Sequence, residues 1–198
     1  MTDDSISAPQ FVDKPRIEAA VRELLYAIGE DPGREGLIDT PRRIADAYSE
    51  VFSGLNENPL EILAVSFEEQ HNEMIILRDI PFFSMCEHHL LPFHGAAHVA
   101  YIPYSRVVGV SKIARLVDAA ARRPQLQERF TSQVADWLMD VLEPEGTAVA
   151  VEAEHLCMTM RGVKKAGSKM ITSAMRGTFK SQSDTRNEFL SLVRTNLA

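Results

Sequence analysis

The sequence predicts an α+β fold in which a small helical lobe precedes an antiparallel sheet with helices packed against it. Three observations support this prediction. Apolar residues recur at helical spacing in the first third of the chain, β-branched and apolar stretches begin after about residue 58, and two helical segments separate two groups of strands. Such runs differ from the regular alternation that is typical of a doubly wound sheet. We therefore expect a flexible tail, a helical lobe and a main domain, at residues 1–14, 15–57 and 58–198.

The helical lobe is predicted from two amphipathic segments. Apolar residues recur at helical spacing from Pro15 to Ile28, and the run Asp31-Pro32-Gly33 is typical of a turn. Thr40-Pro41 supplies a helix N-cap followed by proline at the first helical position. The second helix is expected to end at Gly54.

The main domain is predicted to mix strands with helices. We expect strands at residues 74–77, 95–102, 107–110, 148–154 and 168–178, and helices at residues 111–121, 124–142 and 183–193. The helix at 124–142 has its apolar residues on one stripe, which is typical of a helix that packs on a core.

Composition and charge exclude several classes of protein. The 198 residues carry a net charge of −7, which argues against a general nucleic-acid-binding protein. No apolar run reaches the length of a membrane span, and the first twelve residues are polar and acidic, unlike a secretory signal. We therefore expect a cytoplasmic protein that does not bind membranes.

Cysteine and histidine occur together at two distant places in the sequence. Cys86 and His89 have C-x2-H spacing, which a tight turn can wrap around one metal ion. His155 and Cys157 have H-x-C spacing, and alternate residues of a strand face the same side. Two thiolates and one imidazole, from Cys86, Cys157 and His89, would leave a fourth tetrahedral position open, as in catalytic zinc sites, where zinc lowers the pKa of its water to about 7.

Two other interpretations of these residues remain open. The zinc site could be closed and structural, with His155 as its fourth ligand, although closed sites usually pair their ligands in compact knuckles. A disulfide between the two cysteines is less favoured because the chain shows no export signal. We interpret His71, His94 and His98 as structural or surface residues.

A candidate polyanion site begins where a predicted strand passes through Gly109 into a helix. Ser111 is the expected N-cap, and Lys112 and Arg115 lie on one face of the first turn. Two cations there oppose the helix dipole unless an anion is bound, since a phosphate would accept hydrogen bonds from the free helix N–H groups and from both side chains. Plain surface charge is the alternative. Arg161, four residues after Cys157, adds weight to the anion site.

Gln127 and Glu128 fall in the first turn of the following helix. An acidic residue there suits the helix dipole, which is a sufficient structural explanation. The functional alternative is that Glu128 accepts two N–H bonds from one edge of a guanine, a pair of donors that adenine does not offer.

Several motifs in the same order resemble the GTP cyclohydrolase I family of the zinc-dependent kind. The resemblance runs from about residue 40 to residue 190. It is carried by Cys86-Glu87-His88-His89, by Gly109-Val110-Ser111-Lys112-Ile113 with Arg115, by Arg123-Pro124-Gln125-Leu126-Gln127-Glu128-Arg129, and by Glu154-His155-Leu156-Cys157-Met158 with Arg161-Gly162.

The resemblance implies a tunnelling fold, in which an antiparallel four-stranded sheet carries two helices on one face. It implies a homodecamer of two pentameric rings with active sites at subunit interfaces. The implied reaction converts GTP and water into 7,8-dihydroneopterin triphosphate and formate, the first step of folate and pterin biosynthesis.

The resemblance also implies a role for each matching residue. Cys86, His89 and Cys157 would hold zinc. His155 would move protons at the imidazole ring, and His88 would assist beside the metal. Glu128 would bind guanine with Gln127 nearby. The triphosphate would be bound by Lys112, Arg115, Arg161 and Ser111, and by Arg43 of a neighbouring subunit.

Three rival functions can be distinguished from this one. A zinc nucleobase deaminase would carry H-x-E and P-C-x-x-C motifs, and the sequence has neither. A non-catalytic protein with structural zinc would hold its metal with four protein ligands. A tunnelling-fold relative acting on another pterin or purine could share Glu128, but the cysteine and histidine ligands favour hydrolysis.

Overall fold

The computed structural model describes residues 12–194, so residues 1–11 of the expected tail lie outside the described part. Four short helical segments lead into the sheet: α1 (Lys14–Ala27), α2 (Thr40–Val51), the 3-10 helix η1 (Ser53–Asn56) and α3 (Pro59–Leu63). The Asp13 carboxylate accepts a hydrogen bond from the Arg16 backbone N–H at 3.1 Å and so caps α1.

The boundaries of α2 correct the expectation for the helical lobe. Asp39 is the N-cap residue and Thr40 is already helical, so the predicted cap lies one residue too late. The helix ends at Val51, because the chain tightens into η1 before it reaches Gly54. A Cβ atom on Gly54 would lie 2.4 Å from the Ala119 carbonyl oxygen, so this glycine permits a close approach to the main domain.

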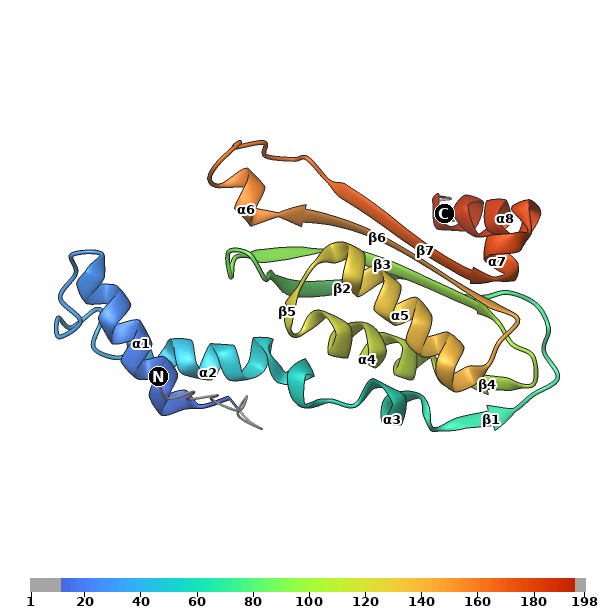
Figure 1. Ribbon diagram of the computed structural model, residues 1–198, viewed down its shortest axis with the longest axis horizontal. Coiled ribbons are helices and arrows are strands. Elements are labelled where there is room, and N and C mark those ends of the chain that lie inside the picture. The colour runs from blue at the N-terminus through green and yellow to red at the C-terminus, as the bar shows by residue number, and fades with distance from the viewer. Residues whose placement is uncertain (1–11, 195–198) are drawn as a thin grey trace, which may run out of the picture.

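Four antiparallel strands form the main sheet: β2 (Ile75–Cys86), β3 (Pro92–Ile102), β6 (Gly146–His155) and β7 (Met170–Gly177). A two-residue strand, β5 (Pro124–Gln125), pairs in parallel with the end of β2, which gives the order β5-β2-β3-β6-β7. The predicted antiparallel α+β class is thereby confirmed (Figure 1).

Strand β2 is much longer than the predicted segment at 74–77. A bulge between Leu77 and Ile80 shifts its register against β3, and Asp79 has a left-handed backbone with φ of 57°. The extra residue changes which side chains face the core, so no single alternating pattern describes the strand. The Asp79 backbone N–H donates to His98 Nδ1 at 3.1 Å, which ties the bulge to β3.

Two helices cover one face of the sheet, α4 (Val110–Ala121) and α5 (Gln127–Leu142), and their apolar faces meet Phe82, Phe93 and Val149 in the main core. The expected helix at 124–142 begins only at Gln127, because Pro124 and Gln125 pair with β2 and Leu126 is extended. Ser111 is likewise not the N-cap of α4; that position belongs to Gly109.

The opposite face is covered at one end by α7 (Thr178–Ser181) and α8 (Ser183–Arg194), which close a smaller core around Phe179 and Phe189 (Figure 1). A separate two-stranded sheet joins β1 (Ser66–Glu68) to β4 (Arg106–Val108), and α6 (Leu156–Thr159) follows β6. Across residues 12–194, every helix is too short or too polar to cross a membrane.

Candidate metal centre and active site

The two cysteine and histidine motifs meet at one end of the sheet. Met85 pairs with Pro92, where β2 turns into β3, and Phe93 pairs with His155, the last residue of β6. The turn after β2 and the start of α6 therefore lie side by side, as Figure 1 shows at the end of the sheet that carries β5.

The turn that carries Cys86 and His89 is held by backbone hydrogen bonds. The N–H groups of His89 and Leu90 both donate to the Cys86 carbonyl, at 3.3 and 2.8 Å, and the Cys86 N–H donates to Leu91 O at 2.9 Å. The Glu87 N–H donates to Gln125 O in β5 at 3.1 Å, so the turn is fixed to the strand that precedes α5.

Cys86, His89 and Cys157 form a cluster that fits a metal ion. Their donor atoms all lie within 4.8 Å of one another, and both cysteines are free thiols. Cys86 Sγ lies 3.7 Å from His89 Nδ1. Zinc bonds to sulfur and nitrogen in a tetrahedron would keep those atoms about 3.6 Å apart. The three side chains could therefore hold a metal with little rearrangement.

The electrostatics of the cluster also favour a cation. Burial, together with the neighbouring Cys86 thiol, raises the pKa of Cys157, whereas Arg161 acts in the opposite direction. Two ionised thiols this close repel each other, and a divalent cation between them would reverse that repulsion and stabilise both thiolates.

His155 reaches the site in a different way from that expected. His155 ends β6 whereas Cys157 lies in the helical turn α6, so the two side chains do not share one face of a strand. Cys157 joins the metal cluster, but the His155 Nε2 atom lies 2.8 Å from Gln127 Oε1 and its ring stacks on Phe93 with centroids 4.6 Å apart. A closed site with His155 as the fourth ligand is disfavoured by these contacts.

Burial affects the proton affinity of His155. Loss of water around the ring lowers its pKa, while the charge of Glu128 acts against that shift. A neutral imidazole is therefore favoured near neutral pH, and such a ring can accept a proton as well as return one.

Gln127 occupies a position unlike that of a substrate ligand. Its side chain is buried, and its amide bonds to the sheet and to His155. Glu128, the next residue, is exposed on the same first turn of α5. Because the Glu128 carboxylate is exposed, it is accessible to a bound ligand.

An ion pair connects the metal-binding turn to α5. Arg129 donates two hydrogen bonds to the Glu87 carboxylate, the longer at 3.1 Å, and this contact lowers the pKa of Glu87. His88 is exposed beside Glu87, with its ring 6.2 Å from the ring of His89. Sequence reasoning did not identify Arg129, although its place within the run at 123–129 was the available signal.

Two of the predicted phosphate ligands, Ser111 and Lys112, lie at the opposite end of the sheet from the cluster. Tyr101 accepts a hydrogen bond from Val108 N at 3.1 Å, so α4 begins near Tyr101, whereas the cluster lies near Pro92 (Figure 1). Tyr101 follows Pro92 by nine positions along β3, which at the rise of a β-strand is about 30 Å. Within one chain, Ser111 and Lys112 at the start of α4 are therefore far from the cluster, and Arg115 lies midway along the helix. The last residue of α4, Ala121, accepts a hydrogen bond from Ser84 Oγ near the end of β2.

Arg161 and Arg43 differ in their relation to the cluster. The Arg161 guanidinium lies 3.0 Å from His89 Nε2 and so adjoins the metal ligands. Arg43 lies on α2, exposed, with its guanidinium 3.5 Å from the Asp39 carboxylate. Of the predicted phosphate ligands, Arg161 is the one that this chain places at its own candidate active site.

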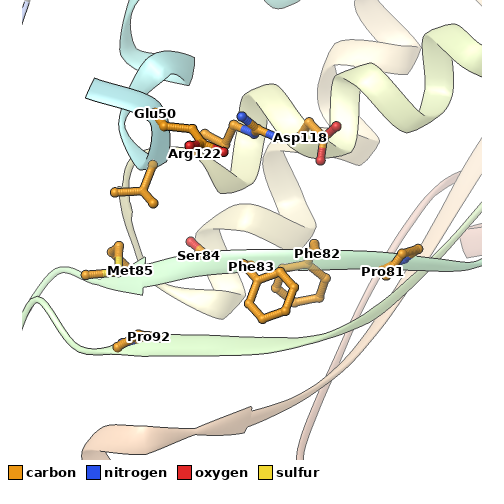
Figure 2. Close-up of a pocket in the computed structure, with 10 residues that line it drawn as sticks. Glu50, Pro81, Phe82, Phe83, Ser84, Met85, Pro92, Asp118 and Arg122 are labelled. Carbon is orange, nitrogen blue, oxygen red and sulfur yellow. The ribbon is translucent and has the colours of Figure 1, made fainter. Parts of the chain in front are cut away.

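A pocket of about 480 Å³ lies elsewhere, between β2 and the ends of α2 and α4. Figure 2 shows Glu50, Asp118 and Arg122 across from Phe83 on the strand. None of the predicted site residues lines this pocket, although Met85 and Pro92, at the strand ends next to Cys86, do.

Fold and site together define an α+β protein with a candidate metal-dependent active site at the end of an antiparallel sheet. A profile of GTP cyclohydrolase I matches residues 17–194. The chain belongs to the GTP cyclohydrolase I family.

Curated relatives agree with that assignment over nearly their whole length. GTP cyclohydrolase 1 of Thermobifida fusca is 58% identical over 192 residues, which cover 96% of this chain and 93% of that protein. GTP cyclohydrolase 1 of Carboxydothermus hydrogenoformans is 61% identical over 184 residues, covering 92% and 96%. GTP cyclohydrolase 1 of Bacillus mycoides is 59% identical over 186 residues, covering 93% and 98%.

Proposed function

We propose that this chain is a zinc-dependent GTP cyclohydrolase that opens the imidazole ring of GTP and yields 7,8-dihydroneopterin triphosphate and formate. The observation that carries the proposal is the convergence of Cys86, His89 and Cys157 within 4.8 Å, beside an oriented His155. The choice of GTP as the substrate rests on membership of the family. We further propose that the fold is the tunnelling fold and that residues 58–198 form the catalytic domain after a helical lobe at 15–57.

Zinc is the metal that the donor set favours, because two thiolates and one imidazole suit its preference for sulfur and nitrogen. When bound, it would supply a Lewis acid that makes water a nucleophile at neutral pH. Three protein ligands leave room for that water, whereas a structural site would use four.

His155 would give and take protons at the ring nitrogens while water adds to C8 of the purine. The C8–N9 bond breaks, hydrolysis of the resulting formamide releases formate, and the opened sugar closes a six-membered ring onto the freed amine. His88, exposed beside the metal ligands, would assist. Glu128 would accept two N–H bonds from guanine, since its carboxylate is exposed one residue after Gln127.

The triphosphate would be held by residues from more than one subunit. Arg161 adjoins His89 in the same chain, but Ser111 and Lys112 begin α4 at the far end of the sheet and Arg115 lies midway along that helix. One nucleotide does not span the distance of about 30 Å between the cluster and the start of α4. A neighbouring copy would therefore supply these residues and Arg43, which supports a homo-oligomer, in this family a decamer of two pentameric rings.

A product assay tests the proposed function. Purified protein is incubated with GTP, and formate and the fluorescent pterin formed after oxidation are measured. We expect both products, loss of both after treatment with a chelator, and their return when zinc is added. Ammonia in place of formate would indicate a deaminase, and full turnover without metal would contradict the zinc assignment.

A further inference from the structure

Gln127 is the first residue of α5 and its side chain is 1% exposed. Its Nε2 group donates to the carbonyl oxygens of Val151 at 3.2 Å and Met170 at 3.0 Å, and contacts Thr172 Oγ1 at 3.2 Å. If the amide were reversed, its own oxygen would face two carbonyl oxygens without a proton between them. The orientation of the Gln127 amide is therefore fixed by the sheet.

Two threonine hydroxyls fix the direction of the same network. Thr131 Oγ1 donates its one proton to the Gln127 backbone oxygen at 2.7 Å. The 2.7 Å contact between Thr131 and Thr172 must then use the Thr172 proton, so Thr172 accepts from Gln127 Nε2. The two Nε2 protons of Gln127 are thus shared among three acceptors, Val151 O, Met170 O and Thr172 Oγ1, and the amide oxygen Oε1 points away from them toward His155.

The partner of Gln127 Oε1 is His155 Nε2, at 2.8 Å. An acceptor at this distance requires a proton on Nε2. The ring is also held from one side by Phe93, which is stacked on it with an interplanar angle of 1°. Both the position of the imidazole and the identity of its protonated nitrogen are thus determined by neighbouring side chains.

We infer that Gln127 is a positioning residue that acts through His155, by holding Nε2 as a permanent donor and leaving Nδ1 as the atom that exchanges protons during the reaction. Nδ1 takes a proton to give an imidazolium with both nitrogens protonated, and later returns that same proton, while the other proton stays on Nε2 and remains hydrogen-bonded to Gln127 Oε1. The inference rests on the proposed acid–base role of His155. It gives a specific role to Gln127, which the family resemblance placed near the guanine site beside Glu128.

A matched pair of variants separates this role from a structural one. Gln127→Leu removes the acceptor, and Gln125→Leu removes an equally buried glutamine that bonds to Ala120 O and Gln133 instead. We expect Gln127→Leu to retain bound zinc and an almost unchanged KM for GTP while kcat falls by about 100-fold, the order contributed by acid–base catalysis. Gln125→Leu should keep kcat within a few-fold of the unsubstituted protein.

A double-mutant cycle tests whether Gln127 acts through His155. In a His155→Ala background, Gln127→Leu should have no further effect on the remaining formate release, since the group that it orients is gone. Full effects of both substitutions in the double variant would overturn the inference. A raised KM with unchanged kcat would do so as well, and would restore Gln127 as a direct ligand of the base.

The same inference can be tested without measuring activity, by nitrogen NMR of metal-loaded protein whose histidines carry an isotope label. The His155 signals, identified by their loss in His155→Ala, should report an imidazole protonated on Nε2 in the unsubstituted protein and in Gln125→Leu. In Gln127→Leu they should report a mixture of the two tautomers. An unchanged tautomer in Gln127→Leu would refute the positioning role, whereas absent formate release from the unsubstituted protein would instead refute the proposed function.

Discussion

Two thiols and one imidazole give the candidate active site its chemical character. Cys86 is buried and Cys157 is half-buried, and burial raises the pKa of the Cys157 thiol. A thiol in that setting ionises only if a cation compensates the lost hydration. At the residue scale, a metal ion bound by the cluster would therefore favour ionisation of the Cys157 thiol.

Substitution of one thiol tests this dependence. Cys157→Ala should lose the bound zinc and, with it, all measurable formate release, because two remaining ligands hold a catalytic metal poorly. His94→Ala is a suitable control, since His94 stacks on Phe83 and is not part of the cluster. Metal analysis and the formate assay check both variants. A Cys157→Ala protein that keeps stoichiometric zinc would contradict the assigned ligands.

At the scale of elements, the pairing of β3 with β6 brings the two motifs together, and it depends on a close backbone approach. A Cβ atom on Gly95 would lie 1.9 Å from the Glu152 carbonyl oxygen and 2.7 Å from the Ala153 Cα atom. Any larger residue at position 95 must push the two strands apart, and β6 ends in His155.

Gly95→Ala should therefore lower the free energy of unfolding by about 1–3 kcal/mol, the usual range for overpacking. Gly109→Ala is a control without overpacking, because nothing lies within 4 Å of a Cβ atom there, and we expect it to cost at most about 1 kcal/mol, since alanine is less favoured than glycine at the N-cap of α4. Urea unfolding measures both. Equal unfolding midpoints for the two variants would show that the two strands can move apart at position 95 without a loss of stability.

The bulge in β2 gives the sheet a predictable response to acid. Burial lowers the pKa of His98 from its model-peptide value of 6.5, although Asp79 opposes the shift. His98 Nδ1 accepts the Asp79 N–H, and a proton on that atom would remove the acceptor. Below pH 6.5 the unfolded chain binds more protons at this residue than the folded chain does, so stability is full above 6.5 and declines as the pH falls toward the lowered value.

His98→Gln should make unfolding in urea less sensitive to pH over this window, because the glutamine oxygen can accept the Asp79 N–H without titrating. The remaining pH dependence would come from groups such as His155, whose pKa is also lowered by burial. The measurement compares midpoints above and below pH 6.5 for both proteins. Identical pH profiles would exclude His98 as a source of acid sensitivity.

Local patterns predicted the elements better than they predicted geometry. Amphipathic spacing identified the longer helices, α1, α2, α4, α5 and α8, but not the short helical segments η1, α3, α6 and α7. The C-x2-H spacing placed Cys86 and His89 in one turn. The extension of β2 was missed because the Asp79 bulge interrupts its alternation. Cys157 was assigned to the correct cluster for the wrong reason, since the chain leaves β6 and enters α6 before it.

Long-range geometry could not be predicted from spacing. The sequence motifs predicted a single site that contains both the cysteine ligands and the segment from Ser111 to Arg115. In the folded chain, the register of the sheet places the start of α4 far from the cysteine ligands. Gln127 is another case, because its burial follows from the packing of α5 on β6 and β7. No local feature of its own sequence marks it as a partner of His155.

At the scale of the whole molecule, the separation of Lys112 and Arg115 from the cluster predicts sites shared between subunits. Cys157→Ala and Arg115→Glu would each be inactive alone, one lacking metal and the other repelling phosphate. If the two proteins are unfolded together and reassembled in equal amounts, random pairing of neighbours should restore about a quarter of the sites. Formate release from the mixture is the measurement. Activity that stays at background would show that each chain binds GTP by itself.

The short strand β5 joins the metal-binding turn to the helix that carries Gln127 and Glu128. Met85 and Cys86 pair with Pro124 and Gln125, and the Glu87 N–H donates to Gln125 O. The turn that carries Cys86 and His89 and the start of α5 are therefore held together by backbone hydrogen bonds of the chain itself. Binding of a metal ion or of a nucleotide should therefore cost little backbone entropy in this region. We also expect hydrogen exchange of the Glu87 amide to be slow in the metal-free protein.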